Sequence, residues 1–191
     1  MVPTLYFTSL SRFLPGLNLK TLTGFSLAVT LMTTTGFQSH AASTGKSGLP
    51  LPRFVSLKSK RVNMRVGPGR EYQVAWMYQK PGLPMEIIQE YDNWRKVRDP
   101  EGNEGWILHS LLTGKRTAII APWDRAQSGK NVEMLSSPDA SASVKAEMEP
   151  GVVASVQECT DSWCRIEVSG VAGIVNKNDI WGVYPDEIIE R

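Results

Sequence analysis

The stretch "NMRVGPGREY", Asn63 to Tyr72, decides how the first half of this 191-residue chain is interpreted. Hydrophobic side chains at Val62, Met64 and Val66 alternate with polar ones, and a period of two is typical of a β-strand. The "GPG" that follows is a turn signal that neither a helix nor a central strand tolerates. The pattern therefore predicts a short strand that ends abruptly at a loop.

The same pattern of strands and turns occurs a second time along the chain. At an offset of 68 to 70 residues, four landmarks recur in the same order. They are Val62–Gly69 with Val132–Asp139, Lys80–Gly82 with Glu149–Gly151, Tyr91–Val97 with Thr160–Ile166, and Gly105–Leu112 with Gly173–Ile180. An offset of this length suits a tandem of compact domains rather than a solenoid. We therefore expect two copies of one small unit.

Each copy is a series of short strand patterns separated by turn signals. In the first copy, strands are expected before the Gly/Pro turn and over "YQVAWMY", "MEIIQEY", "WRKVR" and "GWIL". No stretch shows sustained helical periodicity, which favours an all-β fold in which each copy is a small barrel or sandwich. The expected domain ranges are 58–117 for the first copy and 118–191 for the divergent second copy.

The first 41 residues resemble a secretory signal peptide. They contain Arg12 and Lys20, no acidic residue, an apolar run, and small residues near Ala41. The alternative is a retained membrane anchor, but the apolar run Thr21–Phe37 is short and rich in threonine. We expect cleavage after Ala41, a Gly/Ser/Pro linker over 42–57, and a periplasmic or secreted protein. Membrane contact is expected only if the leader is uncleaved.

Charge is distributed unevenly along the rest of the chain. Positions 53–116 hold 12 basic and 7 acidic residues, whereas positions 124–191 hold 6 basic and 12 acidic ones. The two halves could attract each other, or one of them could face an acidic polymer. Without the leader the basic and acidic residues balance, so the chain lacks the strongly basic surface of a nucleic-acid-binding protein.

The two copies contain equivalent hairpins, and the sequence predicts a different side-chain pair at the same position of each. Pairing Thr160 with Trp163 places Cys159 opposite Cys164, at a Cα separation that suits a disulfide. In an exported chain with two cysteines, this disulfide is the expected state. The corresponding residues of the first copy are Glu90 and Arg95, an opposite-charge pair that follows from a two-residue turn at Asp92 and Asn93.

The first copy resembles a bacterial SH3-like domain over about one third of the chain. The motifs are N-x-R-x-G-P-G-x-x-Y, K-x-G, W-x-K-V and a closing G-W-I, which begin at Asn63, Lys80, Trp94 and Gly105. The resemblance implies a five-stranded, partly open β-barrel that binds cell-wall peptides or targets a wall hydrolase. The second copy departs from the motifs, with Glu133 in place of the Asn and Leu135 in place of the Arg.

The resemblance also implies a shallow groove beside the Gly-Pro-Gly loop. We expect its glycines to permit positive φ, or to let a ligand approach the backbone. Tyr, Trp and Arg are enriched at recognition surfaces, although some aromatic residues must fill the core. We expect Trp106 to be mostly buried, and Trp94 and Tyr72 to be at least half exposed. The candidate ligand-binding residues are Arg65, Tyr72, Tyr91, Trp94 and Arg95.

A peptide or peptidoglycan-like ligand is the expected partner, and a non-enzymatic binding module is the expected function. No catalytic residue, cofactor or metal is expected, because C-x4-C with one distant His does not give zinc spacing, and His109 lacks an evident partner. The alternative is a structural adaptor that docks another periplasmic protein. Trp123 and Trp181, at either end of the second copy, are candidates for the contact between the domains.

Overall fold

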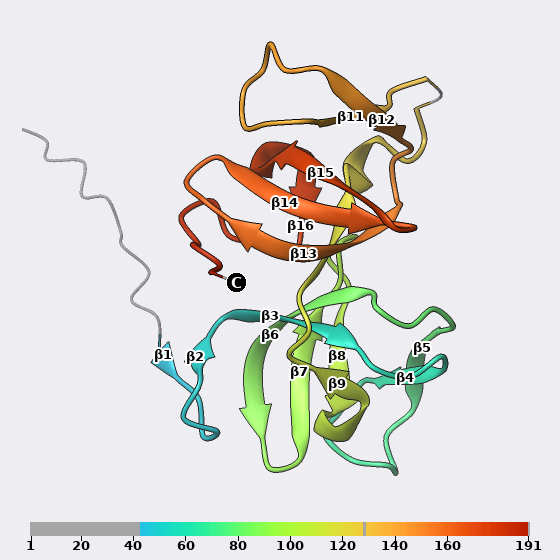
Figure 1. Ribbon diagram of the computed structural model, residues 1–191. Helices are drawn as coiled ribbons and strands as arrows, with labels where there is room; N and C mark the ends of the chain where they lie inside the picture. Colours follow the sequence, from blue (N-terminus) through green and yellow to red (C-terminus); the bar gives the residue numbers. More distant parts are fainter. Residues whose placement is uncertain (1–42, 128, 191) are drawn as a thin grey trace, which may run out of the picture. The chain divides into compact units, whose positions relative to one another are not determined.

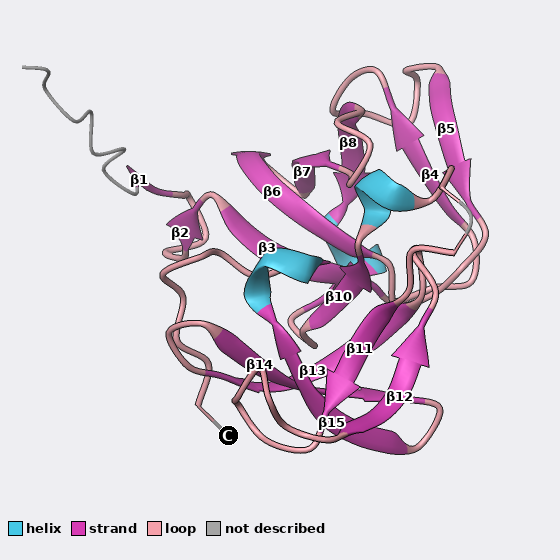
Figure 2. Cartoon of the chain, turned by 90° about the horizontal axis from the view of Figure 1, so that it is seen from above, coloured by secondary structure: helices cyan, strands magenta, loops and turns pink. Residues whose placement is uncertain are grey.

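The computed structural model describes residues 43–127 and 129–190 (Figure 1). The signal peptide expected over 1–41 lies outside these residues. The described residues belong to one compact unit. Its regular structure is almost entirely β, interrupted by short 3-10 turns that appear cyan in Figure 2. Within the described ranges, no helix has the length and apolar character needed to cross a membrane.

The first barrel is one antiparallel sheet with the strand order β5-β4-β8-β7-β6-β3-β9. A 3-10 turn, η1 (His109–Leu111), links the last two strands in sequence. The strands are β3 (Arg53–Leu57), β4 (Val62–Arg65), β5 (Val74–Tyr78), β6 (Pro84–Tyr91), β7 (Trp94–Arg98), β8 (Glu104–Leu108) and β9 (Leu112–Thr113).

The second barrel repeats this topology, with the strand order β12-β11-β15-β14-β13-β10-β16. Its 3-10 turns are η2 (Pro122–Asp124) and η3 (Lys177–Asp179). The strands are β10 (Thr117–Ile120), β11 (Val132–Leu135), β12 (Val144–Met148), β13 (Val153–Cys159), β14 (Trp163–Val168), β15 (Val171–Asn176) and β16 (Ile180–Trp181). The all-β tandem of SH3-like barrels is therefore confirmed.

The strand count differs from the expected five. Each sheet has seven strands, because β3 and β9 join the five expected strands of the first copy, and β10 and β16 do so in the second. The two edge strands of the first sheet, β5 and β9, are not paired with each other, so this barrel is partly open. The additional strands are short or precede the motifs, which is why the turn pattern did not reveal them.

The linker expected over 42–57 is wrong for the described residues 43–57, because most of them belong to strands. β1 (Ser43–Thr44) pairs with β2 (Pro50–Leu51), and β3 pairs with both β6 and β9. Val55 and Leu57 of β3 are buried in the core of the first barrel. The linker was predicted from the Gly, Ser and Pro content of the preceding residues. The strand β3 that follows them, "RFVSL", contains β-favouring side chains.

Alternation along the strands builds the core of each barrel. The first core contains Val62, Met64, Met85, Ile87, Val97 and Ile107, and the second contains Met134, Ala154, Val156, Cys159, Ile166 and Val175. The barrels also share a tight contact: a Cβ at Gly105 would lie 2.5 Å from Cγ of Met64, and one at Gly173 would lie 2.4 Å from Cγ of Met134. The two copies therefore share this glycine–methionine packing as well as their strand order.

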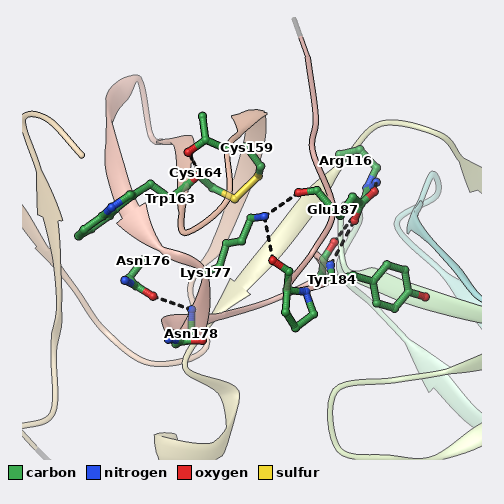
Figure 3. The surroundings of a disulfide bond; sticks show 12 residues. Arg116, Cys159, Trp163, Cys164, Asn176, Lys177, Asn178, Tyr184 and Glu187 are labelled. Atoms are coloured by element: carbon green, nitrogen blue, oxygen red, sulfur yellow. Dashed lines mark hydrogen bonds and ion pairs between the residues drawn. A yellow bond between two sulfur atoms is a disulfide. The ribbon is translucent and has the colours of Figure 1, made fainter. Parts of the chain in front are cut away.

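The equivalent hairpins have the registers expected from sequence. In the first barrel Glu90 pairs with Arg95, and Oε1 of Glu90 lies 3.3 Å from Nε of Arg95. In the second barrel Cys159 pairs with Cys164, and the two form a disulfide with Cα atoms 4.1 Å apart (Figure 3). Both predictions are confirmed, and Asp92 has the positive φ of 44° that its turn requires.

Aromatic side chains lie between β3 and the C-terminal part of the compact unit. Phe54 packs edge-on against Trp181, with ring centroids 5.0 Å apart, and also against Tyr184. The expected role of Trp181 in the contact between the domains is therefore confirmed. The side chain of Trp123 is 55% exposed, and its part in this contact stays a prediction.

Candidate functional site

A groove opens on the outer face of the first barrel, beside β4. Its volume is about 460 Å³. It is lined by Arg61, Asn63, Arg65, Arg70, Trp94, Leu108 and Leu111. Four elements contribute: β4 with its flanking residues, the start of β7, the end of β8 and the turn η1. We call this surface the arginine groove.

The alternation that predicted β4 also explains this groove. Val62 and Met64 are buried in the barrel, so the neighbouring side chains of the strand point to the opposite face. Arg61, Asn63 and Arg65 occupy every second position and therefore line the groove together. One strand thus builds the core with one face and the candidate site with the other.

The three arginines of the groove have no acidic partner within ion-pair distance among residues 43–127 and 129–190. Nη1 of Arg65 donates to the carbonyl of Tyr72 at 2.5 Å, and Nε of Arg61 lies 2.9 Å from Sδ of Met77. The side chains of Arg61 and Arg70 are exposed. Guanidinium groups in this arrangement can bind a carboxylate or a phosphate.

Trp94 gives the groove its apolar wall, together with two leucines. Trp94 pairs with Leu108 across β7 and β8, which places both side chains on the same face. The indole is partly buried rather than at least half exposed as expected. An anionic ligand with an apolar portion could therefore contact guanidinium groups and an aromatic face at once.

The Gly-Pro-Gly loop is shaped by a close contact and not by positive φ. Neither Gly67 nor Gly69 belongs to the positive-φ residues of the described chain, so the expected reason for these glycines is wrong. A Cβ at Gly67 would lie 2.4 Å from Cδ1 of Tyr72. The ring of Tyr72 therefore packs where a side chain would stand, while Arg65 holds the carbonyl of Tyr72.

The structure brings two of the five expected binding residues together in the arginine groove, Arg65 and Trp94. Tyr72 is 43% exposed and packs on Gly67, outside the lining of the groove. Tyr91 is also exposed and packs edge-on against Trp106 at 6.4 Å between centroids. Trp106 is mostly buried, as we expected.

Arg95 does not belong to the arginine groove, because adjacent residues on a strand point to opposite faces. Its neighbour Trp94 faces the groove, while Nε of Arg95 lies 3.3 Å from the buried carboxylate of Glu90. Burial alone would raise the pKa of Glu90, but hydrogen bonds from Ser47 and Arg53 and the charge of Arg95 lower it to about 2. Arg95 thus has a structural partner.

Five lining residues were not among the candidates: Arg61, Asn63, Arg70, Leu108 and Leu111. The period of two on β4 could have identified Arg61 and Asn63, because both share the parity of Arg65. The positions of Leu108, Leu111 and Arg70 depend on how β8, η1 and the loop after β4 approach one another. That tertiary arrangement has no signal in the local sequence.

The candidates for catalysis lie apart from the groove. His109 is exposed and lines a separate cavity of about 210 Å³, together with Arg53 and Arg95. Both cysteines are joined in the disulfide. Across the described ranges, no group of three or more His, Cys, Asp or Glu side chains is arranged to hold a metal ion.

Comparison with known proteins gives one curated relative and several structural neighbours. The chain is 24% identical over 124 residues to the Bacillus subtilis (strain 168) protein named "Putative N-acetylmuramoyl-L-alanine amidase YrvJ". The match covers 63% of this chain and 24% of that protein, so the chain spans about a quarter of its length.

Two solved structures from Trichomonas vaginalis also match at 12% identity. NlpC2 matches with a TM-score of 0.30, over 68% of this chain and 48% of its own. NlpC1 matches with a TM-score of 0.31, over 76% and 50%. At these scores the likeness adds nothing to the assignment of fold or function.

The family model described as bacterial SH3 domain matches twice, over residues 58–114 and 128–182. The two matches correspond to the two sheets, and together they cover more than half of the chain. The chain therefore belongs to the bacterial SH3 domain family.

Proposed function

We propose that this protein is a non-enzymatic binding module of the bacterial envelope, and that the arginine groove of its first barrel recognises an anionic peptide or peptidoglycan-like ligand. Guanidinium groups bind the carboxylates of the ligand, and the indole of Trp94 covers an adjacent apolar part. Recognition by a shallow groove requires no catalytic group.

The observation that carries this proposal is the convergence of three arginines on one aromatic wall without acidic partners. Most other arginines of the described chain are used in ion pairs, such as Arg53 and Arg95 with Glu90, or Arg116 with Glu187. Like charges that share a groove without a counter-ion repel one another. An anionic ligand would relieve this repulsion, which supports a binding role.

The ligand class is suggested by the name of the Bacillus relative, which refers to N-acetylmuramoyl-L-alanine. Peptides of the cell wall carry free carboxylates next to small apolar side chains, and this combination matches the arginines and the indole of the groove. The disulfide between Cys159 and Cys164 fits a location outside the cytoplasm, where such bonds persist.

The surroundings of the titratable groups support binding rather than catalysis. Cysteine nucleophiles need a free thiolate, and both cysteines of the chain are oxidised. His109 begins the turn η1 with an exposed side chain, and it does not line the arginine groove. A general base requires a partner that orients it and a substrate within reach.

Sedimentation with isolated peptidoglycan tests the proposal. The wild-type protein should sediment, and Arg70→Gln should reduce the bound fraction, because this exposed arginine contributes charge without a structural contact. Lys80→Gln, which removes one exposed positive charge outside the groove, is the matched control. Equal sedimentation of both variants and wild type would contradict the assigned groove, and wild type that stays in the supernatant would contradict the ligand class.

A specific observation also favours the adaptor as a second candidate function. Strand β5 is an edge of the first sheet, and its side chains Val74, Trp76 and Met77 are 46%, 56% and 37% exposed. An apolar edge strand can pair with a strand of another protein. In that case crosslinking through β5 would recover a defined envelope protein, and Trp76→Ser would abolish its capture while Arg70→Gln would not.

A further inference from the structure

The second barrel contains a groove in the same place as the arginine groove. Its volume is about 520 Å³. It is lined by Asn131, Val132, Glu133, Leu135, Ala140, Trp163, Asn176, Asn178 and Asp179. Figure 3 shows that Trp163, Asn176 and Asn178 gather on the side of this barrel away from Tyr184 and Arg116. We call this surface the acidic groove.

The two grooves correspond residue by residue through the repeat. Every lining residue of the arginine groove has its counterpart in the acidic groove at an offset of 68 to 70 residues. The pairs are Arg61 with Asn131, Asn63 with Glu133, Arg65 with Leu135, Arg70 with Ala140, Trp94 with Trp163, Leu108 with Asn176, and Leu111 with Asp179. A cavity that recurs at the same place of both barrels is a property of the fold, and its chemistry is set by these substitutions.

Only the tryptophan is the same in both grooves, and the charge is inverted. All three arginines are replaced by uncharged residues, and carboxylates appear at Glu133 and Asp179. Neither carboxylate has a Lys, Arg or His within ion-pair distance in the part of the chain that the structure describes. Both grooves therefore have a tryptophan wall, but the charged side chains are positive in the first groove and negative in the second.

Neighbouring strands strengthen the negative field around the acidic groove. Glu147 of β12 stands directly opposite Glu133, and its Oε2 accepts a hydrogen bond from Nδ2 of Asn131 at 3.1 Å. The pKa of Asp179 is raised, first by burial and then by the charge of Asp124. Two lysines are close in sequence to the groove carboxylates, but each has another partner. Nζ of Lys130 lies 3.4 Å from Oδ1 of Asp124, and Nζ of Lys177 donates to the carbonyls of Pro185 and Glu187.

The side chains that line the acidic groove favour the binding of a cation. Carboxylates and side-chain amides accept hydrogen bonds from an ammonium group, and an indole face attracts a positive charge. The described residues offer no cluster of three or more metal-ligating side chains here, so a metal ion is not the fitting occupant. We propose that the acidic groove binds the ammonium group of a peptide-like ligand, between the indole of Trp163 and the carboxylates of Glu133 and Asp179.

This site is independent of the function proposed for the first barrel, because its residues belong to the second barrel alone. If the arginine groove failed to bind peptidoglycan, the acidic groove would still be expected to bind amines. If the acidic groove failed, anion binding near Trp94 would be unaffected. Each groove also contains one tryptophan, so the indole N–H signals in one NMR spectrum report on the two grooves separately.

The test follows the indole N–H signals of the six tryptophans by NMR while a small probe is added to the protein. The probe is Nα-acetyl-lysine amide, which carries one ammonium group. Its uncharged control is the same molecule acetylated at Nε, and its anionic control is Nα-acetyl-alanine. Trp163→Phe and Trp94→Phe assign the two reporter signals.

The lysine probe should move the signal of Trp163 with a dissociation constant in the range of about 1 to 20 mM and leave that of Trp94 in place. The uncharged control, and Glu133→Gln combined with Asp179→Asn, should each weaken this binding by about fivefold or more. Glu149→Gln, which removes an exposed acid outside the groove, should not. Unchanged signals of the other tryptophans show that the variants remain folded.

Three results would overturn the assignment: no movement of the Trp163 signal at about 20 mM probe, equal movement with the uncharged control, or full binding by the doubly substituted variant. Glu133→Gln removes one of two facing carboxylates at Glu133 and Glu147, so it relieves repulsion. Asp179→Asn removes a charge that burial and Asp124 disfavour, so neither substitution should threaten the fold.

Discussion

Replacing Glu90 by Gln should lower the free energy of unfolding of the first barrel by about 3 kcal/mol, although the two side chains have nearly the same size and shape. The side chain of Glu90 is 2% exposed. Ser47 donates to it through its backbone N–H and its hydroxyl, both at 2.7 Å, and Nη2 of Arg53 donates at 2.7 Å. Arg95 adds a positive charge, with its Nε 3.3 Å from Oε1 of Glu90. Glutamine has the same shape, but it leaves both arginines without their counter-ion.

The magnitude follows from the pKa of Glu90. Burial favours the neutral acid, yet the donors of Ser47 and Arg53 and the charge of Arg95 outweigh burial and lower the pKa from 4.5 to about 2. Since one unit of pKa corresponds to about 1.4 kcal/mol, the folded state prefers the carboxylate by roughly 3 kcal/mol. A lowered pKa stabilises the folded state above pH 4.5, and this contribution is lost as the pH falls towards 2.

Urea unfolding at neutral and acidic pH measures both effects. At pH 7, Glu90→Gln should have a lower free energy of unfolding than wild type, and the difference should shrink as the pH approaches 2. The backbone N–H of Ser47 should also exchange faster with solvent in the variant. The matched control is Glu101→Gln, which removes an ion pair with Arg125 whose side chains are 52% and 51% exposed, and should cost less than about 1 kcal/mol. Equal stability of Glu90→Gln and Glu101→Gln would refute the reasoning.

Three further predictions concern the loop, the disulfide and the groove. Gly67→Ala should cost about 1 to 3 kcal/mol in urea unfolding, because its Cβ overlaps the ring of Tyr72; in a Tyr72→Ala background most of this cost should disappear, and an equal cost in both backgrounds would exclude the overlap as the cause. Replacing Cys159 and Cys164 by Ser should lower the free energy of unfolding by about 2 kcal/mol, and a reducing agent should then have no additional effect. Raising NaCl from about 50 to about 500 mM should release wild type from peptidoglycan more than it releases Arg70→Gln, because salt screens the guanidinium charge; identical salt profiles would argue against an electrostatic contribution.

Much of the fold could be predicted because its signals are local. The alternation around Met64 and the repeat of turn signals specify strands, and the spacing of Cys159 and Cys164 specifies a register that the structure confirms. The strand β3 was missed because its five residues follow a segment rich in Gly, Ser and Pro. Its partners β6 and β9 lie far along the chain, so the pairing that makes it a strand is not visible in its own sequence.

The candidate site was harder to predict than the fold because it depends on which face each side chain occupies. Arg65 and Trp94 were identified by residue type and motif, and they share the arginine groove. Arg95 is a candidate by residue type alone, but adjacent residues on a strand point to opposite faces, so Arg95 and Trp94 do not share the groove. Arg70 lies in a loop, and its approach to Trp94 depends on tertiary packing that a motif does not encode.

The central claim is that the arginine groove, rather than the exposed edge strand β5, is the surface that recognises the ligand. The most direct measurement follows the indole N–H signals of Trp94 and Trp76 by NMR while soluble, carboxylate-bearing peptidoglycan fragments are added to wild type and to Arg70→Gln. The Trp94 signal should move, the Trp76 signal should stay in place, and Arg70→Gln should weaken the response. Movement of the Trp76 signal with a stationary Trp94 signal would show that β5, and not the arginine groove, recognises the ligand.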